Sequence, residues 1–142
     1  MKIRPALPID AEAIGRIRVD AWRAAYRDHM PSEYLAGLDP KANLDGLRET
    51  LMSPEPPFVL SVAEYDHEVV AFSMSGHPRY QAEPGTFELW ALNVDPNCWR
   101  KGVGRRLVQE VLKSARRSKP SRVELWCING NLAAASLYES CG

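Results

Sequence analysis

Two kinds of hydrophobic periodicity divide this chain into strands and helices. Alternation of apolar and polar positions predicts five strands, at residues 2–5, 58–64, 68–76, 86–94 and 122–128. Apolar residues that recur every three or four positions predict helices that begin near residues 8, 32, 44 and 102, with a last helix after residue 131. The chain therefore mixes both element types along its whole length.

The segment at residues 89–113 organises the rest: a strand, a basic turn that contains glycine, and then a helix. A helix start leaves four backbone N–H groups without partners and carries partial positive charge. Gly102 and Gly104 let a ligand approach there, and four basic residues raise the local potential. The turn suits a phosphate or pyrophosphate. An ordinary strand–turn–helix is the alternative. Neither a dinucleotide fingerprint nor a Walker loop fits. Leu107 stands where the dinucleotide fingerprint needs its third glycine, and Val103 follows Gly102 where a Walker loop needs lysine.

This segment resembles the acyl-CoA-binding part of the GNAT superfamily of N-acetyltransferases. The family motif is Gln/Arg-x-x-Gly-x-Gly/Ala after a strand that ends in Val-x-Pro. The corresponding residues here are Val94-Asp95-Pro96 and then Trp99-Arg100-Lys101-Gly102-Val103-Gly104, with Trp99 at the first motif position. A second block resembles the family's Asn-x-x-Ala-x-x-x-Tyr-x-x-x-Gly helix, and it consists of Asn131, Ala134, Tyr138 and Gly142.

The resemblance covers nearly the whole chain and implies a single α/β domain at residues 1–142, with a mixed, largely antiparallel sheet flanked by helices. Family members usually continue past the position of Gly142 into two more strands, which this sequence lacks. We therefore expect either a fragment or a sheet edge that is covered otherwise, for instance in a homodimer, because an open apolar edge invites pairing. Such a domain should be less stable than a full-length relative or should self-associate.

The resemblance implies acetyl-CoA as the acyl donor. The backbone of residues 100–105, namely Arg100, Lys101, Gly102, Val103, Gly104 and Arg105, would hold the pyrophosphate. Leu92, Asn93 and Val94 would hydrogen-bond the pantetheine arm, and an N–H near Leu92 or Asn93 would stabilise the developing oxyanion. Asn131 would contact the cofactor, or simply cap the last helix.

Two residues are the catalytic candidates. The family's tyrosine at the position of Tyr138 protonates the leaving thiolate, and a helix-surface or core aromatic is the alternative. Glu88 is the candidate general base, since a partly buried carboxylate has a raised pKa. Alternation places Glu88 on one strand face with Trp90 and Leu92, and the alternative is a solvent-facing strand residue. His77 and Glu83, in the preceding loop, are weaker candidates for the base.

The acceptor is expected to be a primary amine on a small molecule or a peptide. Aromatic residues accept cations or flat apolar groups. Those that could line the acceptor pocket are Trp22, Tyr26, Tyr34 and Trp90, although an individual aromatic of this kind is more often a core residue.

Composition bears on the binding partners, the cellular compartment and the metal content of the protein. Eighteen basic residues balance 18 acidic ones, so overall charge favours neither nucleic acid nor a membrane surface, and nine basic residues at positions 100–122 lack interleaved aromatics. Three cysteines at unrelated spacings predict reduced thiols in a cytoplasmic protein. Three histidines show no metal-ligand spacing, so we expect no metal. A non-catalytic acyl-CoA-binding or regulatory module, an interaction domain with a vestigial site and a generic phosphate binder are the alternatives to an enzyme.

Overall fold

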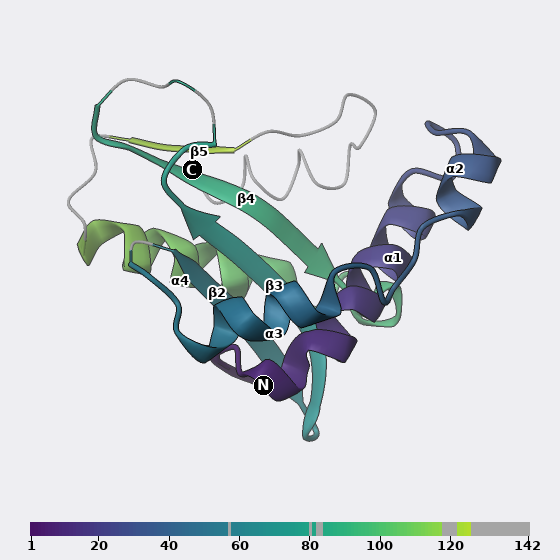
Figure 1. Ribbon diagram of the computed structural model, residues 1–142, viewed down its shortest axis with the longest axis horizontal. Coiled ribbons are helices and arrows are strands. Elements are labelled where there is room, and N and C mark those ends of the chain that lie inside the picture. Colours follow the sequence, from purple (N-terminus) through teal and green to yellow (C-terminus); the bar gives the residue numbers. More distant parts are fainter. Residues whose placement is uncertain (57, 80, 82–83, 118–121, 126–142) are drawn as a thin grey trace.

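A five-stranded mixed sheet forms the centre of the part of the chain that the computed structural model describes, residues 1–56, 58–79, 81, 84–117 and 122–125. The strands lie side by side in chain order (Figure 1). Their bounds are β1 (Lys2–Pro5), β2 (Val59–Tyr65), β3 (Glu68–Gly76), β4 (Thr86–Val94) and β5 (Arg122–Leu125). Neighbouring strands are antiparallel except β4 and β5, which are parallel. The predicted mixed, largely antiparallel sheet is confirmed.

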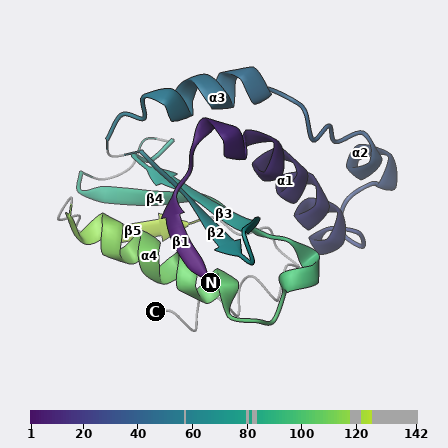
Figure 2. The same ribbon diagram turned by 90° about the horizontal axis from the view of Figure 1, so that it is seen from below.

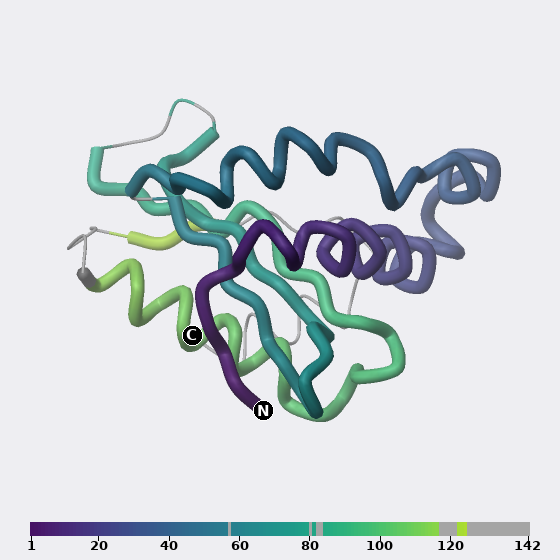
Figure 3. The backbone as a smooth tube through the Cα atoms, turned by 60° about the horizontal axis from the view of Figure 1, so that its bottom comes forward, coloured from purple at the N-terminus to yellow at the C-terminus, as the bar shows by residue number. Residues whose placement is uncertain are grey.

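Helices cover both faces of this sheet. They are α1 (Ala11–Ala25), α2 (Ser32–Ala36), α3 (Leu44–Met52) and α4 (Val103–Arg117), with short 3-10 turns η1 (Pro8–Asp10) and η2 (Pro96–Cys98). Figure 2 shows α1 and α3 on one side and α4 on the other, and Figure 3 shows the same three layers from another angle. The predicted helix starts at residues 32, 44 and 102 are correct to within one residue.

The apolar residues that predicted the helices form a core on each side of the sheet. On the side of α1 and α3 the buried cluster contains Ala6, Ile14, Ile17, Leu51, Leu60, Val62 and Phe72. On the side of α4 two clusters contain Ala63, Val70, Ala71, Val103, Leu107, Phe87, Leu89, Val111 and Ala115. The sheet is thus buried on both faces, which is why its inner strands are apolar almost throughout.

Two sequence expectations need adjustment. The helix predicted from residue 8 begins as a 3-10 turn, closed by the Asp10 N–H donating to the Leu7 carbonyl oxygen at 2.8 Å, before α1 proper starts. The strand predicted at residues 122–128 is β5 as far as Leu125. Its remaining residues and the predicted last helix lie outside the described part of the chain.

A buried ion pair fixes the start of α1 to the sheet. Two nitrogens of the Arg4 guanidinium donate to the two carboxylate oxygens of Asp10, at 2.8 and 3.0 Å. The Leu7 N–H donates to the same carboxylate at 2.7 Å, and Arg4 also contacts Glu64 at 3.2 Å. Burial by itself would raise the pKa of Asp10, but the hydrogen bonds from Arg4 and Leu7 outweigh it and hold that pKa below its usual value.

Candidate active site

The two halves of β4 have different neighbours. Its first half, from Thr86 to Leu89, pairs with β5 on one side, and Glu88 and Leu89 also pair with β3 on the other. The described residues of β5 end at Leu125, which pairs with Leu89, and residues 91–94 of β4 pair with β3 as the one described neighbour. Within the described part of the chain, the second half of β4 therefore offers one row of backbone N–H and C=O groups to another partner. An extended ligand can hydrogen-bond to such an edge as a strand would.

A β-bulge separates these halves at Trp90. Leu89 and Ala91 pair with consecutive residues of β3, so Trp90 is one extra residue in β4. The bulge shifts the alternation of side chains. Leu89 and Leu92 both pack toward α4, whereas Glu88 lies on the opposite face. The predicted common face of Glu88, Trp90 and Leu92 is therefore wrong, because period-two counting fails across an inserted residue.

The turn between β4 and α4 is held in place by its own side chains. The Trp99 indole N–H donates to the Val94 carbonyl oxygen at 2.8 Å. Asp95 accepts the Asn97 N–H at 3.0 Å, and Arg16 of α1 contacts its carboxylate at 3.3 Å. The end of β4 and the start of α4 are thus joined by a short, well-bonded connection.

Gly102 makes the start of α4 accessible. Its φ of +80° lies in the left-handed region, which disfavours other residue types, and a Cβ built there would have no atom within 4 Å. Lys101 and Arg105 are exposed beside it, and Arg100 has a φ of +66°. An open backbone position with exposed cations at a helix N-terminus fits a diphosphate group.

Glu88 is the most deeply buried acidic side chain among the described residues, with 2% of its side chain exposed. Its Oε1 accepts the Arg79 Nε–H at 2.9 Å and the Arg79 backbone N–H at 3.3 Å. The Arg79 guanidinium also donates to the Trp90 carbonyl oxygen at 3.2 Å and lies 5.3 Å from the centre of the Trp90 ring. Arg79 therefore balances the charge of this carboxylate while contacting the bulge residue.

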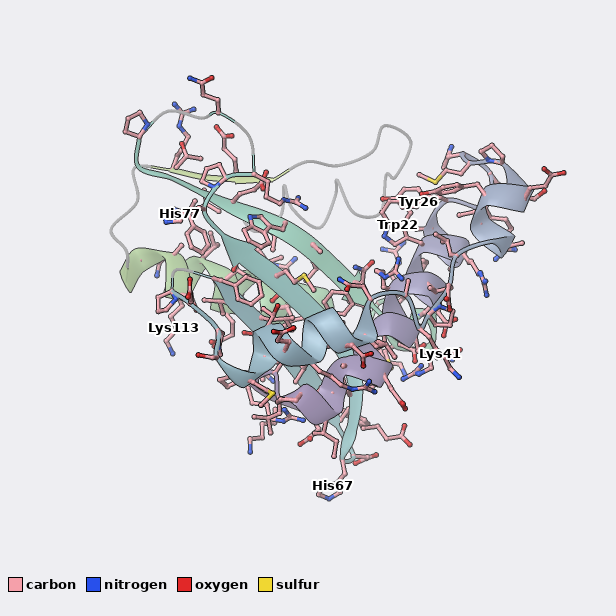
Figure 4. The ribbon with its side chains drawn as sticks, in the orientation of Figure 1. Trp22, Tyr26, Lys41, His67, His77 and Lys113 are labelled. Carbon is pink, nitrogen blue, oxygen red and sulfur yellow. The ribbon has the colours of Figure 1, made fainter. Side chains whose placement is uncertain are left out.

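The Trp90 ring has fixed surroundings. Its Nε1–H donates to the His77 carbonyl oxygen at 2.8 Å, and the Phe58 ring lies 5.5 Å away. His77 itself is exposed, at the end of the sheet labelled in Figure 4. Of the two loop residues considered as alternative bases, His77 thus contributes its backbone to the Trp90 contact, and Glu83 lies outside the described residues.

The four predicted acceptor-pocket aromatics do not form one described cluster. Trp22 of α1 and Tyr26, which directly follows α1, meet edge to face at 4.9 Å, and Figure 4 shows them side by side. Tyr34 is 54% exposed on α2, and Trp90 packs against Phe58 instead. The structure therefore divides these aromatics between the end of α1 and the centre of β4.

Tyr138 and Asn131 lie outside the described residues, so their roles remain predictions. Arg79 was missed, because a polar residue in a loop shows no periodicity; the signal was a carboxylate inside an apolar strand, which requires a nearby cation. Among the described residues there is no group of side chains that could hold a metal ion, and no helix there is long and apolar enough to cross a bilayer.

Sequence and structure comparisons identify the family. The family model described as Acetyltransferase (GNAT) family matches residues 12–142. The chain therefore belongs to this family, which places it in the class of acetyltransferases, and the resemblance drawn from its motifs is confirmed.

Individual relatives agree with this assignment. The chain is 27% identical over 103 residues to a mycothiol acetyltransferase of Segniliparus rotundus, a match that spans 70% of this chain and 39% of the relative. It is 26% identical over 129 residues to an uncharacterized N-acetyltransferase of Bacillus subtilis, YuaI, covering 91% of this chain and 72% of the relative. The chain thus spans well under half of the first relative and most of the second.

The fold matches a solved structure of the same class. The PaiA N-acetyltransferase of Thermoplasma acidophilum, in complex with coenzyme A, superimposes with a TM-score of 0.84. The match covers 99% of this chain and 87% of that chain, at 19% identity. At this identity the agreement establishes the fold.

Proposed function

We propose that this chain transfers an acetyl group from acetyl-CoA to a primary amine by direct attack in a ternary complex. The observation that carries the proposal is the continuous run of backbone from the second half of β4, which within the described residues pairs with β3 alone, to the open start of α4. A long ligand with an amide-containing arm and a diphosphate matches this run in order. The similar Thermoplasma acidophilum structure, which holds coenzyme A, supports the same ligand.

Binding would divide between two segments. Residues 92–94 would hydrogen-bond the pantetheine arm along the β4 edge, in the manner of an added strand. The backbone N–H groups of Val103, Gly104 and Arg105 would hold the diphosphate, with Arg100 and Lys101 adding positive charge. Acetyl-CoA supplies an activated thioester carbonyl when it is bound. The side chains and backbone of this chain would deprotonate the amine, stabilise the oxyanion and protonate the departing sulfur.

Three groups would carry the chemistry. Glu88 would accept a proton, directly or through water, so that the amine can attack as a neutral nucleophile. A backbone N–H near Leu92 or Asn93 would stabilise negative charge at the carbonyl oxygen, where one such donor is typically worth about 3 kcal/mol. Tyr138 would donate a proton at the departing sulfur. No cysteine takes part in this scheme.

One observation favours a second candidate, a non-catalytic acyl-CoA-binding module. Arg79 already occupies the Glu88 oxygen that would serve as the base. A carboxylate held in this way could be purely structural. The two candidates differ in one measurable respect, since only the enzyme releases CoA in the presence of an amine.

The first test is a calorimetric titration of the chain with acetyl-CoA, beside the variants Gly104→Glu and Gly104→Gln. A carboxylate at the start of α4 should abolish binding through charge and bulk, and the neutral amide of equal size should weaken it less. Thermal melts of all three proteins check that folding is preserved. Binding by wild type that neither variant reduces would rule out the proposed cofactor site.

The second test is CoA release with a panel of primary amines. Amine-dependent release supports the enzyme, whereas tight acetyl-CoA binding with no release by any amine supports the non-catalytic module. We further propose a cytoplasmic setting, which is supported by the free thiol of Cys98, since reducing compartments keep thiols unpaired.

A further inference from the structure

We propose that Glu88 and Trp90 form a subsite for the ammonium group of the acceptor, and that Arg79 fills this subsite while no acceptor is bound. The inference rests on the proposed function and deepens it by naming the acceptor class: an aliphatic amine that is a cation at neutral pH. Three independent features of the cluster lead to this assignment.

The first feature is a carboxylate that requires a cation. Glu88 is almost fully buried, and an ionised carboxylate in that position is costly unless a positive group pairs with it. Within the described residues Arg79 is its ion-pair partner, at 2.9 Å. Any ligand that removes Arg79 must therefore bring a positive charge of its own.

The second feature is an aromatic surface already aligned with a cation. The Arg79 guanidinium lies over the Trp90 ring at 5.3 Å, within the range of a cation–π contact. The ring is held by the His77 carbonyl oxygen on its Nε1 and by Phe58 beside it. A Cβ on Gly76 would come within 3.1 Å of the same ring, so the glycine makes room for it. The Trp90 ring therefore keeps its position when another cation replaces the Arg79 guanidinium.

The third feature is the weak hold on Arg79 itself. Its side chain is 57% exposed, and of the guanidinium only the Nε–H reaches the carboxylate, at the one oxygen that the Arg79 backbone N–H also contacts. Its terminal nitrogen donates to the Trp90 carbonyl oxygen. A primary ammonium group has three N–H donors, so it can bond both of these oxygens while lying on the ring. It reproduces the guanidinium contacts in a smaller volume.

A neighbouring hydroxyl indicates what else the acceptor carries. Thr86 lies on the same face of β4 as Glu88, two residues away, and its Oγ1 is buried without a hydrogen-bond partner in the described structure. Positions two residues apart on a strand are separated by about 7 Å. A diamine or an amino alcohol with its second polar group at this spacing would bond both sites.

The assignment has a consequence for affinity. Arg79 competes with the acceptor, so removing it should strengthen the binding of cationic amines rather than weaken it. A purely structural role for Arg79 gives the opposite result, because its loss would then damage the pocket. Neutral molecules of the same length should bind poorly in either case, since they leave the Glu88 carboxylate without a cation.

The test is an NMR titration that follows the Trp90 indole N–H, assigned with a Trp90→Phe variant. The probe is 1,4-diaminobutane, and the neutral probe of equal length is 1,4-butanediol, both at constant ionic strength. Wild type, Arg79→Ala and Glu88→Gln are compared. Arg48→Gln serves as the matched control, because Arg48 also pairs with carboxylates, but both of these, Glu12 and Asp45, are exposed.

We expect the diamine to shift the Trp90 signal in wild type and the diol to leave it unmoved. Arg79→Ala should bind the diamine at least fivefold more tightly, Glu88→Gln at least tenfold more weakly, and Arg48→Gln as wild type does. Equal affinity in wild type and Arg79→Ala, or equal shifts from the diol and the diamine, would overturn the proposal. If Arg79→Ala does not fold, the Arg79 Nε–H signal of wild type decides, since displacement must move it at saturation.

No acetyl-CoA is present in this titration, so its outcome is separate from that of the cofactor tests. A chain that binds acetyl-CoA and fails to bind the diamine at Trp90 retains the proposed function and loses this subsite. A chain that binds the diamine there without binding acetyl-CoA retains the subsite and loses the proposed function.

Discussion

Two pairs in this molecule each join an arginine to a buried carboxylate, but they differ in hydrogen bonding and in the exposure of the arginine. Arg4 and Asp10 meet through two parallel hydrogen bonds, and the Arg4 side chain is only 19% exposed. Arg79 reaches Glu88 with one side-chain nitrogen and is 57% exposed. Both carboxylates are buried. The difference lies in the arginine: the covered Arg4 guanidinium bonds both oxygens of its carboxylate, whereas the exposed Arg79 guanidinium bonds one carboxylate oxygen and the Trp90 carbonyl oxygen.

The largest expected effect comes from breaking the Arg4–Asp10 pair. Asp10→Asn leaves the Arg4 guanidinium partly buried without its main counter-ion, and we expect a loss of about 3 kcal/mol in the free energy of unfolding. Urea denaturation measures it. Asp45→Asn, which breaks an exposed contact with Arg48, should leave the urea midpoint in place. Equal midpoints for wild type and Asp10→Asn would show that the bidentate pair does not stabilise the fold.

The matching change in the other pair should affect catalysis more than folding. Glu88→Gln is expected to lower kcat about a hundredfold by removing the base, and to flatten the acid limb of the pH–rate profile. CoA release at a series of pH values measures both. Turnover with an unchanged pH profile would exclude Glu88 as the base.

Lowering the pH should weaken the stabilising effect of the Arg4–Asp10 pair, and this change should be smaller than the effects of the two substitutions above. The pKa of Asp10 is held below its ordinary value of about 3.8, so its ionised form contributes stability above that pH and loses it as the pH falls through the lower, folded-state pKa. The stability difference between wild type and Asp10→Asn should be constant above about pH 5 and should shrink below about pH 4. Urea titrations across this range test it, and a difference that grows toward low pH would contradict it.

The smallest effect distinguishes the two guanidinium groups directly. Arg4→Lys exchanges a fork that bonds two oxygens for a single ammonium group, and should cost about 1 kcal/mol of stability. Arg79→Lys keeps one charge at one oxygen and should leave the thermal midpoint unchanged. Thermal unfolding of both variants under one set of conditions measures the contrast. Equal destabilisation by the two changes would mean that the pairs are held alike.

The sequence predicted the arrangement of elements because the elements depend on local periodicity. The two-residue repeat over residues 68–76 gave β3 with its observed bounds, and that over residues 86–94 gave β4. Recurring apolar positions from Val103 to Ala115 gave α4. The glycine at position 102, which the motif highlighted, has the left-handed φ that suits a helix start open to a ligand.

The same periodicity failed where the strand contains an extra residue. Counting by two placed Leu92 beside Glu88, but the bulge at Trp90 sends Leu92 toward α4. A bulge depends on how β4 pairs with β3, and no short stretch of sequence contains both strands. Face assignments beyond the bulge therefore required the assembled sheet.

Short stretches of the chain were enough to assign it to its class, a GNAT-family α/β domain with a basic glycine turn at the start of a helix. These features are encoded by residues close together in the chain. The groups that surround the buried Glu88 carboxylate, in contrast, could be identified from the packed fold alone. Arg79, Glu88 and Trp90 meet because Arg79, which follows β3, lies against the bulge in β4, and contacts of that kind depend on the packed sheet rather than on any local pattern.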